Sequence, residues 1–424
     1  MGEFNNIPSY WKIVDLKSIT DSIQYGYTES SAKEKIGPKF LRITDIQNNK
    51  VQWDDVPYCK IDNELKGKYL LKDGDLVFAR TGATVGKSFL IKGDIPEAVF
   101  ASYLIRVRVN LKMNEKFLSY FFNSPDYWSQ ITEGQVGIGQ PNVNGTKLGQ
   151  LRIPIPPLSE QQLIVSKIEE LLSDLENGKQ QLLLAQQQLK VYRQSLLKWA
   201  FEGKLTNKNV KDGELPKGWK WVTLGEVCNK IGDIDHKMPK QISSGYPYVS
   251  TKDFTDNLKI SFENAKYISK EDYLNLARKI RPERGDIIFP RYGTIGKNIL
   301  VDFDKEFLVS YSCAVVKPNH DLVLSKYVYL FTLSPKITEE IRKYTVETTQ
   351  ANVGIASIKS FVFPFPPLSE QQLIVDELES KLTVCDKIEE TISQSLQQAE
   401  TLKQSILKKA FEGKLVNVEI EKVN

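Results

Sequence analysis

The decapeptide PPLSEQQLIV occurs twice in this chain, at Pro156–Val165 and again, without a single change, at Pro366–Val375. The hexapeptide AFEGKL follows each copy, at Ala200–Leu205 and at Ala410–Leu415. Both pairs share an offset of 210 residues, and the stretch RQSLLKWAFEGKL aligns with KQSILKKAFEGKL at that offset. Two matches without a change at one offset indicate an internal duplication, and a duplication constrains the fold more than any single motif does.

The sequence before each decapeptide repeats more loosely. IPSYWKIVDL from Ile7 matches LPKGWKWVTL from Leu215, and GDLVFARTGATVGK from Gly74 matches GDIIFPRYGTIGK from Gly285. The chain is therefore predicted to be a tandem duplication of one unit, in which a variable lobe precedes a near-invariant segment. The predicted segments are lobes at 1–156 and 207–366, each followed by a spacer segment, at 157–206 and 367–424.

Each near-invariant segment is predicted to begin as a capped helix. Pro157 and Pro367 end the preceding extended run. A serine then stands at the N-cap with a glutamine three residues later, and leucines on either side of the serine can form a hydrophobic staple. The capping pairs are Ser159 with Gln162 and Ser369 with Gln372, and the staple pairs are Leu158 with Leu163 and Leu368 with Leu373.

Apolar residues follow both caps at a 4–3 spacing, which is typical of a coiled-coil seam. The first seam is predicted at Ile164, Ile168, Leu171, Leu175, Leu182, Ala185, Leu189, Tyr192, Leu196 and Trp199. The second is less regular and is predicted at Leu378, Leu382, Cys385, Ile392, Ala399, Leu402 and Ile406. We expect the two helices to pack antiparallel within the chain, as a rod of roughly 60 Å, with a pseudo-twofold axis between the halves. The alternative is a coiled coil that joins two chains.

The lobes mix strand-like runs with short helices. LLKDGDLVFARTG and ASYLIRVRVN are typical of strands, whereas EKFLSYFFNSP and SKYVYLFTLSP are typical of amphipathic helices that stop at Ser-Pro. The predicted fold class is α+β, with two globular lobes of mixed α/β structure separated by the two long helices.

If the lobes bind DNA, the candidate contacts are the polar and aromatic residues in their irregular segments, because loops can reach the major groove, where each base pair offers a distinct donor–acceptor pattern. In the first lobe they are Lys33, Lys35, Lys39, Arg42, Arg80, Thr81, Lys87, Gln135 and Gln140. In the second they are His236, Lys237, Lys240, Tyr246, Tyr248, Lys252, Arg291, Tyr292, Lys297, Thr348, Thr349 and Gln350. Arg80 with Arg291, and Lys87 with Lys297, recur in both lobes. We expect these four residues to have a shared structural role or to contact phosphates, because residues that read bases should differ between the lobes.

Composition argues against several classes of function. The four cysteines, Cys59, Cys228, Cys313 and Cys385, lie far apart and form no CxxC pair, which favours reduced thiols over disulfides or a zinc site. Two histidines leave little for a metal centre or a Ser–His–Asp triad. The N-terminal MGEFNNIPSYWK has no apolar core of a signal peptide and no run of 18 apolar residues occurs, so we expect a cytoplasmic protein without a membrane span.

Charge and motifs point to a chain that binds without catalysing. Residues 1–156 carry 20 Lys and Arg against 17 Asp and Glu, and residues 207–366 carry 24 against 19, so both lobes are mildly basic. GATVGKS at Gly82–Ser88 has three residues between its glycines where a Walker A motif needs four. No NPPY-type or DPPY-type tetrapeptide of an adenine methyltransferase is present. We therefore expect no catalytic residues, no metal and no cofactor in this chain.

The repeated PPLSEQQ and AFEGKL, with the lobe pattern W-K-x-x-x-L, G-D-[LI]-[VI]-F-x-R-x-G and a late Q-x-N-V, closely resemble the specificity subunits of type I restriction–modification enzymes. The resemblance covers essentially the whole chain. It implies that the lobes are target recognition domains, each reading one half of an asymmetric, interrupted site in double-stranded DNA. It also implies that the helices are spacers that seat two methyltransferase subunits, with restriction subunits joining them. S-adenosylmethionine, ATP and magnesium would then belong to those partners.

The residues expected to form the spacers and to face partners are Ser159, Gln162, Leu171, Leu175, Leu189, Trp199, Phe201, Ser369, Gln372, Leu378, Ile392, Leu402 and Phe411. Lys409 stands where the first copy has Trp199, so the two methyltransferase contacts need not be equivalent. Two alternatives stay open. One is the specificity subunit of a fused methyltransferase–nuclease of type IIB or IIG, and the other is a coiled-coil scaffold that does not bind DNA. No sequence code gives the bases read or the gap between the half-sites.

Overall fold

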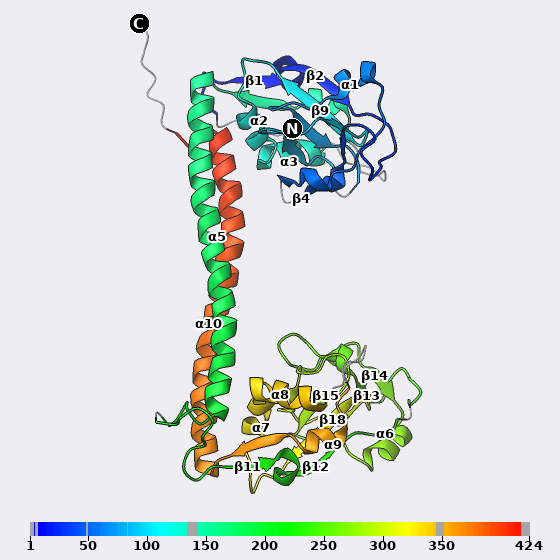
Figure 1. Cartoon of the computed structure of the whole chain (residues 1–424), viewed down its shortest axis with the longest axis vertical. Coiled ribbons are helices and arrows are strands. Elements are labelled where there is room, and N and C mark those ends of the chain that lie inside the picture. The colour runs from blue at the N-terminus through cyan, green and yellow to red at the C-terminus, as the bar shows by residue number, and fades with distance from the viewer. Residues whose placement is uncertain are drawn as a thin grey trace. The chain divides into compact units, whose positions relative to one another are not determined.

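The computed structural model describes residue 4 and residues 7–47, 50–82, 84–133, 143–207, 209–236, 238–344 and 352–416. The chain divides into two compact units (Figure 1). Unit 1 comprises Met1–Leu182 and Gln394–Asn424, and unit 2 comprises Leu183–Ser393. Each unit therefore contains one lobe and parts of both long helices, α5 (Leu158–Phe201) and α10 (Leu368–Phe411). No helix among the described residues is long and apolar enough to span a membrane.

The lobe of unit 1 is built on a four-stranded sheet with the order β2-β9-β6-β7, accompanied by the pairs β1-β10, β3-β8 and β4-β5. Its strands are β1 (Lys12–Asp15), β2 (Thr20–Tyr25), β3 (Lys39–Leu41), β4 (Ile46–Gln47), β5 (Lys50–Val51), β6 (Leu76–Ala79), β7 (Ser88–Leu90), β8 (Ala98–Phe100), β9 (Leu104–Val109) and β10 (Arg152–Ile155). Its helices are α1 (Asn63–Tyr69), α2 (Glu115–Phe121), α3 (Pro125–Glu133) and α4 (Gly145–Gly149). In the four-stranded sheet all pairs are antiparallel.

The lobe of unit 2 repeats this topology, with a four-stranded sheet of order β12-β18-β15-β16, a three-stranded sheet β14-β13-β17 and the pair β11-β19. Its strands are β11 (Lys220–Thr223), β12 (Cys228–Gly232), β13 (Tyr246–Val249), β14 (Lys266–Ile268), β15 (Ile287–Pro290), β16 (Ile299–Leu300), β17 (Leu308–Val309), β18 (Cys313–Pro318) and β19 (Val362–Phe365). Its helices are α6 (Lys270–Ala277), α7 (Ser325–Thr332), α8 (Pro335–Tyr344) and α9 (Ile355–Lys359). The predicted α+β class and the duplication are confirmed.

The predicted caps of the long helices are wrong. Because α5 begins at Leu158 and α10 at Leu368, the serines lie inside the first turn and Pro157 and Pro367 occupy the cap position. The glutamine that is buried at each helix start is Gln161 or Gln371, one residue before the predicted Gln162 or Gln372. Gln161 and Gln371 donate to the carbonyls that precede the two prolines, at 2.9 and 3.0 Å. The staple prediction also fails, because Leu158, Leu163, Leu368 and Leu373 are exposed.

In unit 1 the start of α5 packs against the end of α10, which makes the two helices antiparallel. Ile164 and Ile168 share one hydrophobic core with Ile406, Ala410 and Phe411. Lys179 reaches across to Glu400, with 2.6 Å between the nitrogen and the carboxylate oxygen.

Unit 2 has the same arrangement with the helices exchanged. Leu189, Leu196 and Phe201 of α5 share a core with Leu378 and Cys385 of α10. Arg193 holds two acids of α10, Asp386 at 2.6 Å and Glu389 at 3.1 Å. The predicted internal antiparallel pair is thus confirmed.

The seam itself differs from the prediction in two ways. Tyr192, Trp199 and Leu402 are exposed rather than buried, because the residues beside them, such as Leu196 and Leu197, take the inward positions. The second seam, which the sequence shows as the less regular one, is in fact buried at every seventh residue, at Leu378, Cys385, Ile392, Ala399 and Ile406. Cys385 and Ala399 make this heptad pattern hard to recognise in the sequence, yet both are small apolar residues that fit a buried seam position.

Candidate nucleic-acid interface

The decapeptide fastens the lobe of unit 1 to α5 through two buried polar side chains. Glu160 is 3% exposed and accepts hydrogen bonds from the indole nitrogen of Trp11 at 3.2 Å and the hydroxyl of Tyr10 at 3.1 Å. Gln161 is 1% exposed, and its oxygen accepts from the backbone nitrogen of Asn114 at 3.0 Å. Buried polar groups need such partners, so the two side chains set the angle at which the lobe meets the helix.

Unit 2 uses the same two residue types at the second decapeptide. Gln371 accepts from the backbone nitrogen of Leu324 at 2.9 Å and donates to the carbonyl of Leu322 at 3.0 Å. Glu370 accepts from the side-chain amide of Asn207 at 2.7 Å. Sequence reasoning assigned capping to the neighbouring residues and missed Glu160, Gln161, Glu370 and Gln371. Their identity in both copies could not single them out, because all ten residues of the decapeptide are identical.

The phenylalanine of the repeated hexapeptide AFEGKL packs into the core of a lobe in both units. Phe201 at the end of α5 lies against Tyr327 and Phe331 of α7, with ring centroids 5.2 and 5.4 Å apart. In unit 1 the matching contact comes from the end of α10, where Phe411 lies 5.1 Å from Phe117 and 5.2 Å from Phe121. The lobe near the start of the chain is therefore completed by the helix near its end.

The aspartate of the Gly-Asp pair that recurs in both lobes has a structural role. Asp75 is buried and accepts two hydrogen bonds of 2.8 Å from Arg108, and Asp286 accepts one of 2.6 Å from Lys317. Burial raises the pKa of Asp286, against the opposing effect of Lys317.

Burial also raises the pKa of Cys313 to about 12, so that this thiol stays protonated at neutral pH.

The two arginines that recur in the lobes both contact the valine that ends the late Q-x-N-V motif, Val143 in unit 1 and Val353 in unit 2. Arg291 is 7% exposed, forms an ion pair with Asp233 and donates from its Nε to the carbonyl of Val353 at 2.9 Å. The carbonyl of Arg80 accepts from the backbone nitrogen of Val143 at 3.0 Å. This placement agrees with a shared structural role for the pair and leaves the guanidinium of Arg291 inside the protein.

Arg80 and Arg291 also mark the place where the lobes differ most plainly. In unit 1 the guanidinium carbon of Arg80 lies 4.9 Å from the ring centre of Tyr25, and the backbone nitrogen of Arg80 donates to the carbonyl of Tyr103. Tyr103 is 63% exposed. In unit 2 the same place holds a stack of His236 on Tyr311, with ring centroids 4.6 Å apart and an interplanar angle of 25°. Neither Tyr25, Tyr103 nor Tyr311 was among the predicted contacts.

Several other predicted contacts are engaged within their own lobes. Lys39 donates to the carbonyls of Asp54 and Val56, and Arg42 pairs with Asp45 at 2.7 Å. Tyr248 is 4% exposed, and burial raises its pKa to about 12. The remaining engaged residues are Tyr246, which stacks on Tyr273, Tyr292, which lies beside Arg291, and Lys297, which pairs with Asp256.

The predicted contacts whose side chains face solvent are fewer. Thr81 is half-buried, and the exposed ones are Lys33, Lys35, Lys87, His236, Lys240 and Lys252. Six further predictions, Gln135, Gln140, Lys237, Thr348, Thr349 and Gln350, lie outside the described residues.

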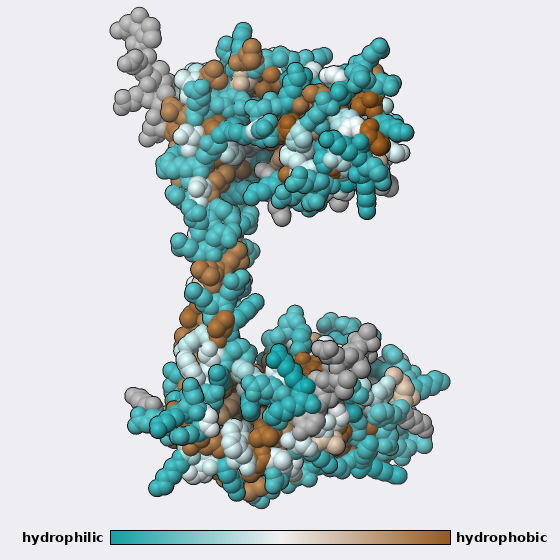
Figure 2. All heavy atoms as spheres, viewed as in Figure 1, coloured by the Kyte–Doolittle hydropathy of each residue, from teal (hydrophilic) through white to brown (hydrophobic). Residues whose placement is uncertain are grey.

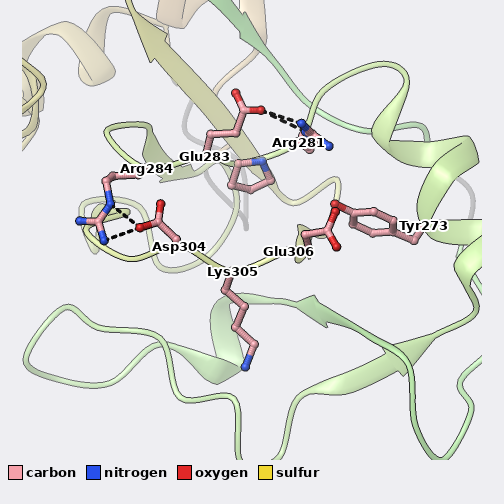
Figure 3. Close-up of a pocket in the computed structure, with 8 residues that line it drawn as sticks. Tyr273, Arg281, Glu283, Arg284, Asp304, Lys305 and Glu306 are labelled. Carbon is pink, nitrogen blue, oxygen red and sulfur yellow. Dashed lines mark hydrogen bonds and ion pairs between the residues drawn. The ribbon is translucent and has the colours of Figure 1, made fainter.

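One surface hollow of unit 2, with a volume of about 380 Å³, collects charged side chains (Figure 3). Arg281 pairs with Glu283 at 3.0 Å, and Arg284 pairs with Asp304 at 2.8 Å. Lys305 points away from both pairs (Figure 3). Each arginine already has a carboxylate partner, and the three basic side chains that line the hollow are balanced by Glu283, Asp304 and Glu306, so the hollow offers an anionic ligand no net positive charge.

Comparison with known proteins places both halves of the chain in one group. The sequence model of the family described as "Type I restriction modification DNA specificity domain" matches residues 8–185 and 216–398. The chain is 26% identical to the EcoKI specificity subunit of Escherichia coli (strain K12), over 96% of this chain and 90% of that protein. It is also 26% identical to the StySPI specificity subunit of Salmonella potsdam, with the same coverage of both proteins.

Two solved structures share the fold over nearly their full length. One is the HsdS subunit from Thermoanaerobacter tengcongensis, with a TM-score of 0.62, 21% identity and coverage of 96% of this chain and 98% of that one. The other comes from work on complex assembly and conformational transition of the type I R-M system, with a TM-score of 0.72, 20% identity and coverage of 96% and 99%.

Proposed function

The chain belongs to the family of type I restriction–modification specificity subunits, and we propose that its two lobes read the two halves of an asymmetric, interrupted DNA site. The observation that carries this proposal is the contrast between the lobes at one shared place. Two lobes of one topology hold Arg80 on Tyr25 in unit 1, and His236 on Tyr311 in unit 2. A shared scaffold with different side chains at its surface is what reading two different half-sites requires.

The proposed base-reading residues are the exposed ones of each cluster, Tyr103 in unit 1 and His236 in unit 2, and the half-buried Arg80 and Tyr311 support them. A phenol hydroxyl and an imidazole can both form hydrogen bonds to base edges. The exposed lysines Lys33, Lys35 and Lys87 in the first lobe, with Lys240 and Lys252 in the second, are proposed to contact phosphates. Phosphate contacts position the protein without carrying sequence information, so these lysines tolerate differences between the lobes.

Specificity subunits of this family work with methyltransferase subunits, restriction subunits and DNA. We further propose that this chain seats two methyltransferase subunits, that it performs no catalysis itself and that the complex acts in the cytoplasm. S-adenosylmethionine, ATP and magnesium would then be bound by the partners. Exposed residues of the long helices, including Gln162, Leu163 and Trp199, are available for such seats.

The experiment that tests the DNA proposal combines the chain with the methyltransferase subunit of its own restriction–modification system and maps methylated adenines by single-molecule sequencing. We expect one interrupted motif with two different halves. His236→Ala should relax or abolish recognition of one half, and Tyr103→Ala should do the same to the other half. A methylated motif that both variants change in the same half would overturn the assignment of one half-site to each lobe.

Replacing residues 207–366 with the corresponding lobe of another family member provides a second test. The exchanged chain should methylate a motif in which one half is new and the other is unchanged. If the assembled complex methylates no interrupted motif, the alternatives return. Methylation by a fused methyltransferase–nuclease would then favour the type IIB or IIG system, and the absence of any binding to duplex DNA would favour the scaffold.

A further inference from the structure

Helix α5 carries a second apolar stripe, which lies on the surface of unit 2. Leu184, Val191, Tyr192 and Trp199 are 54, 67, 43 and 41% exposed, and they line a shallow groove of about 460 Å³ together with Gln187, Gln188 and Ser195. Figure 2 shows apolar residues at the surface of the long helices. Contiguous exposed apolar groups of this size are uncommon on a surface that only water meets.

The spacing of the stripe indicates what covers it. Positions 184, 188, 191, 195 and 199 recur every three or four residues, so they line one face of the helix. The buried seam at Leu189, Leu196 and Ala200 lies about 120° further round the helix, at 100° per residue. A helix with two apolar stripes packs against two neighbours. The first neighbour is α10, and the shape and periodicity of the open stripe fit another helix.

Helix α5 places no unpaired charge at the margins of the stripe. Between Leu183 and Phe201, α5 carries Lys190, Arg193 and Lys198 and no acidic residue. Arg193 is paired with acids of α10, and Lys198 lies 3.8 Å from Glu202. Lys190 lies at least about 100° round the helix from every apolar residue of the stripe. The complementary occupant is therefore an amphipathic helix that meets the stripe with its apolar face.

Unit 1 carries a different surface at the equivalent positions of α10. With the 210-residue offset, Leu184 corresponds to Gln394, Val191 to Thr401 and Trp199 to Lys409. Leu402, which corresponds to Tyr192, is the apolar residue kept at these four positions and is 51% exposed. The duplication therefore preserves the helix but removes most of the apolar area from this face.

A second surface is the same in both units. Leu158 and Leu163 are 42 and 53% exposed at the start of α5, and Leu368 and Leu373 are 41 and 60% exposed at the start of α10. About half of each of these side chains faces solvent, so each unit presents the same apolar surface at the start of its helix. An identical exposed surface on both units fits two copies of one partner.

We propose that the chain offers its methyltransferase partner two unequal seats, a tight one on unit 2 and a weak one on unit 1. This inference rests on the proposed function. The leucines at the helix starts are the part shared by both seats, and the stripe from Leu184 to Trp199 strengthens the seat of unit 2 alone. A complex with one methyltransferase subunit therefore forms first, and the second subunit joins at a higher concentration.

The test titrates the full chain with the methyltransferase subunit of its own system and follows the 1:1 and 2:1 complexes by native mass spectrometry and sedimentation. We expect two dissociation constants that differ by at least about tenfold, because a buried tryptophan is commonly a dominant interface residue. Trp199→Lys should weaken the tight step by about tenfold or more. The matched variant Lys409→Trp should strengthen the weak step and leave the tight one unchanged.

Three outcomes would overturn the inference or its basis. Equal constants in the unaltered chain, or a Trp199→Lys variant with unchanged constants, would overturn the unequal seats while leaving the proposed function intact. Self-association of the chain alone that disappears in Trp199→Lys would assign the stripe to a second copy instead. The absence of methyltransferase binding at either seat would overturn the proposed function itself. Both substitutions are at exposed positions, and circular dichroism verifies that the variants fold.

Discussion

A buried glutamine at the start of each long helix joins three parts of the structure. Gln161 donates to the carbonyl of Pro156, accepts from the nitrogen of Asn114 and so connects the lobe, the linking proline segment and α5. Its partner Asn114 in turn caps α2 by accepting from the backbone nitrogen of Phe117 at 3.1 Å. A single side chain thus aligns two helices that are far apart in the sequence.

Replacing Gln161 with alanine is expected to destabilise unit 1 by about 2 kcal/mol, because a buried donor and a buried acceptor lose their partner. Thermal unfolding followed by calorimetry measures the change as a lower Tm. Gln162→Ala is the matched control, since this neighbouring glutamine is exposed, and it should leave the Tm nearly unchanged. A larger loss in the control than in Gln161→Ala would restore the capping box that the sequence suggested.

The residue scale is also where sequence reasoning failed most often. Nothing local distinguishes Gln161 from Gln162, because the atoms that choose between them belong to Asn114, 47 residues away. For Arg291 the sequence left two roles open, shared architecture or a phosphate contact, and the residue that pairs with it inside the protein is Asp233, 58 residues away. Residue types can be predicted for a site, but the partner that buries a polar side chain comes from the tertiary fold.

The long helices were predictable as elements, and their faces were not. Periodicity predicted both helices and their length, and the duplication predicted that they pair antiparallel within the chain. It could not show which of two apolar stripes on α5 faces α10, because Leu196 and Trp199 both fit a 4–3 spacing from Leu189. The number of apolar stripes on one helix reflects the number of its neighbours, and only packing separates the internal neighbour from the external one.

Gly178 in the middle of α5 provides a test at the scale of the element. A Cβ atom placed on it would meet no heavy atom within 4 Å, and glycine is a poor helix former. Gly178→Ala should therefore stabilise the helix by about 0.5–1 kcal/mol. The measurement is slower amide hydrogen exchange around residue 178 by mass spectrometry. Faster exchange at this position would show that the helix needs a flexible joint there.

At the scale of the whole molecule, each unit is completed by a helix end that belongs to the other half of the duplicated sequence. Phe411 lies against Phe117 and Phe121 in unit 1, and Gly413 sits with positive φ so close to Pro8 that no Cβ would fit. Unit 2 repeats this with Phe201 and Gly203. The internal repeat predicted two similar halves and placed the hexapeptides in the spacer segments 157–206 and 367–424, without showing that each one completes the lobe of the other half.

Phe411→Ala is expected to cost unit 1 about 3–5 kcal/mol, because it removes a fully buried aromatic ring from the core of that lobe. Hydrogen exchange should then rise in α2, and α7 of unit 2 should stay protected. Phe201→Ala is the reciprocal variant and should raise exchange in α7 alone. Equal loss of protection in both lobes for either variant would show that the units unfold together.

Gly413 lies against Pro8, so residues near opposite ends of the sequence are adjacent in unit 1. This proximity permits circular permutation of the chain. A permuted gene that joins the two termini through a short linker and begins near residue 208 would encode the same two units in the opposite order. Such a chain is expected to keep the interior contacts of both units while it encodes the lobe of unit 2 before the lobe of unit 1.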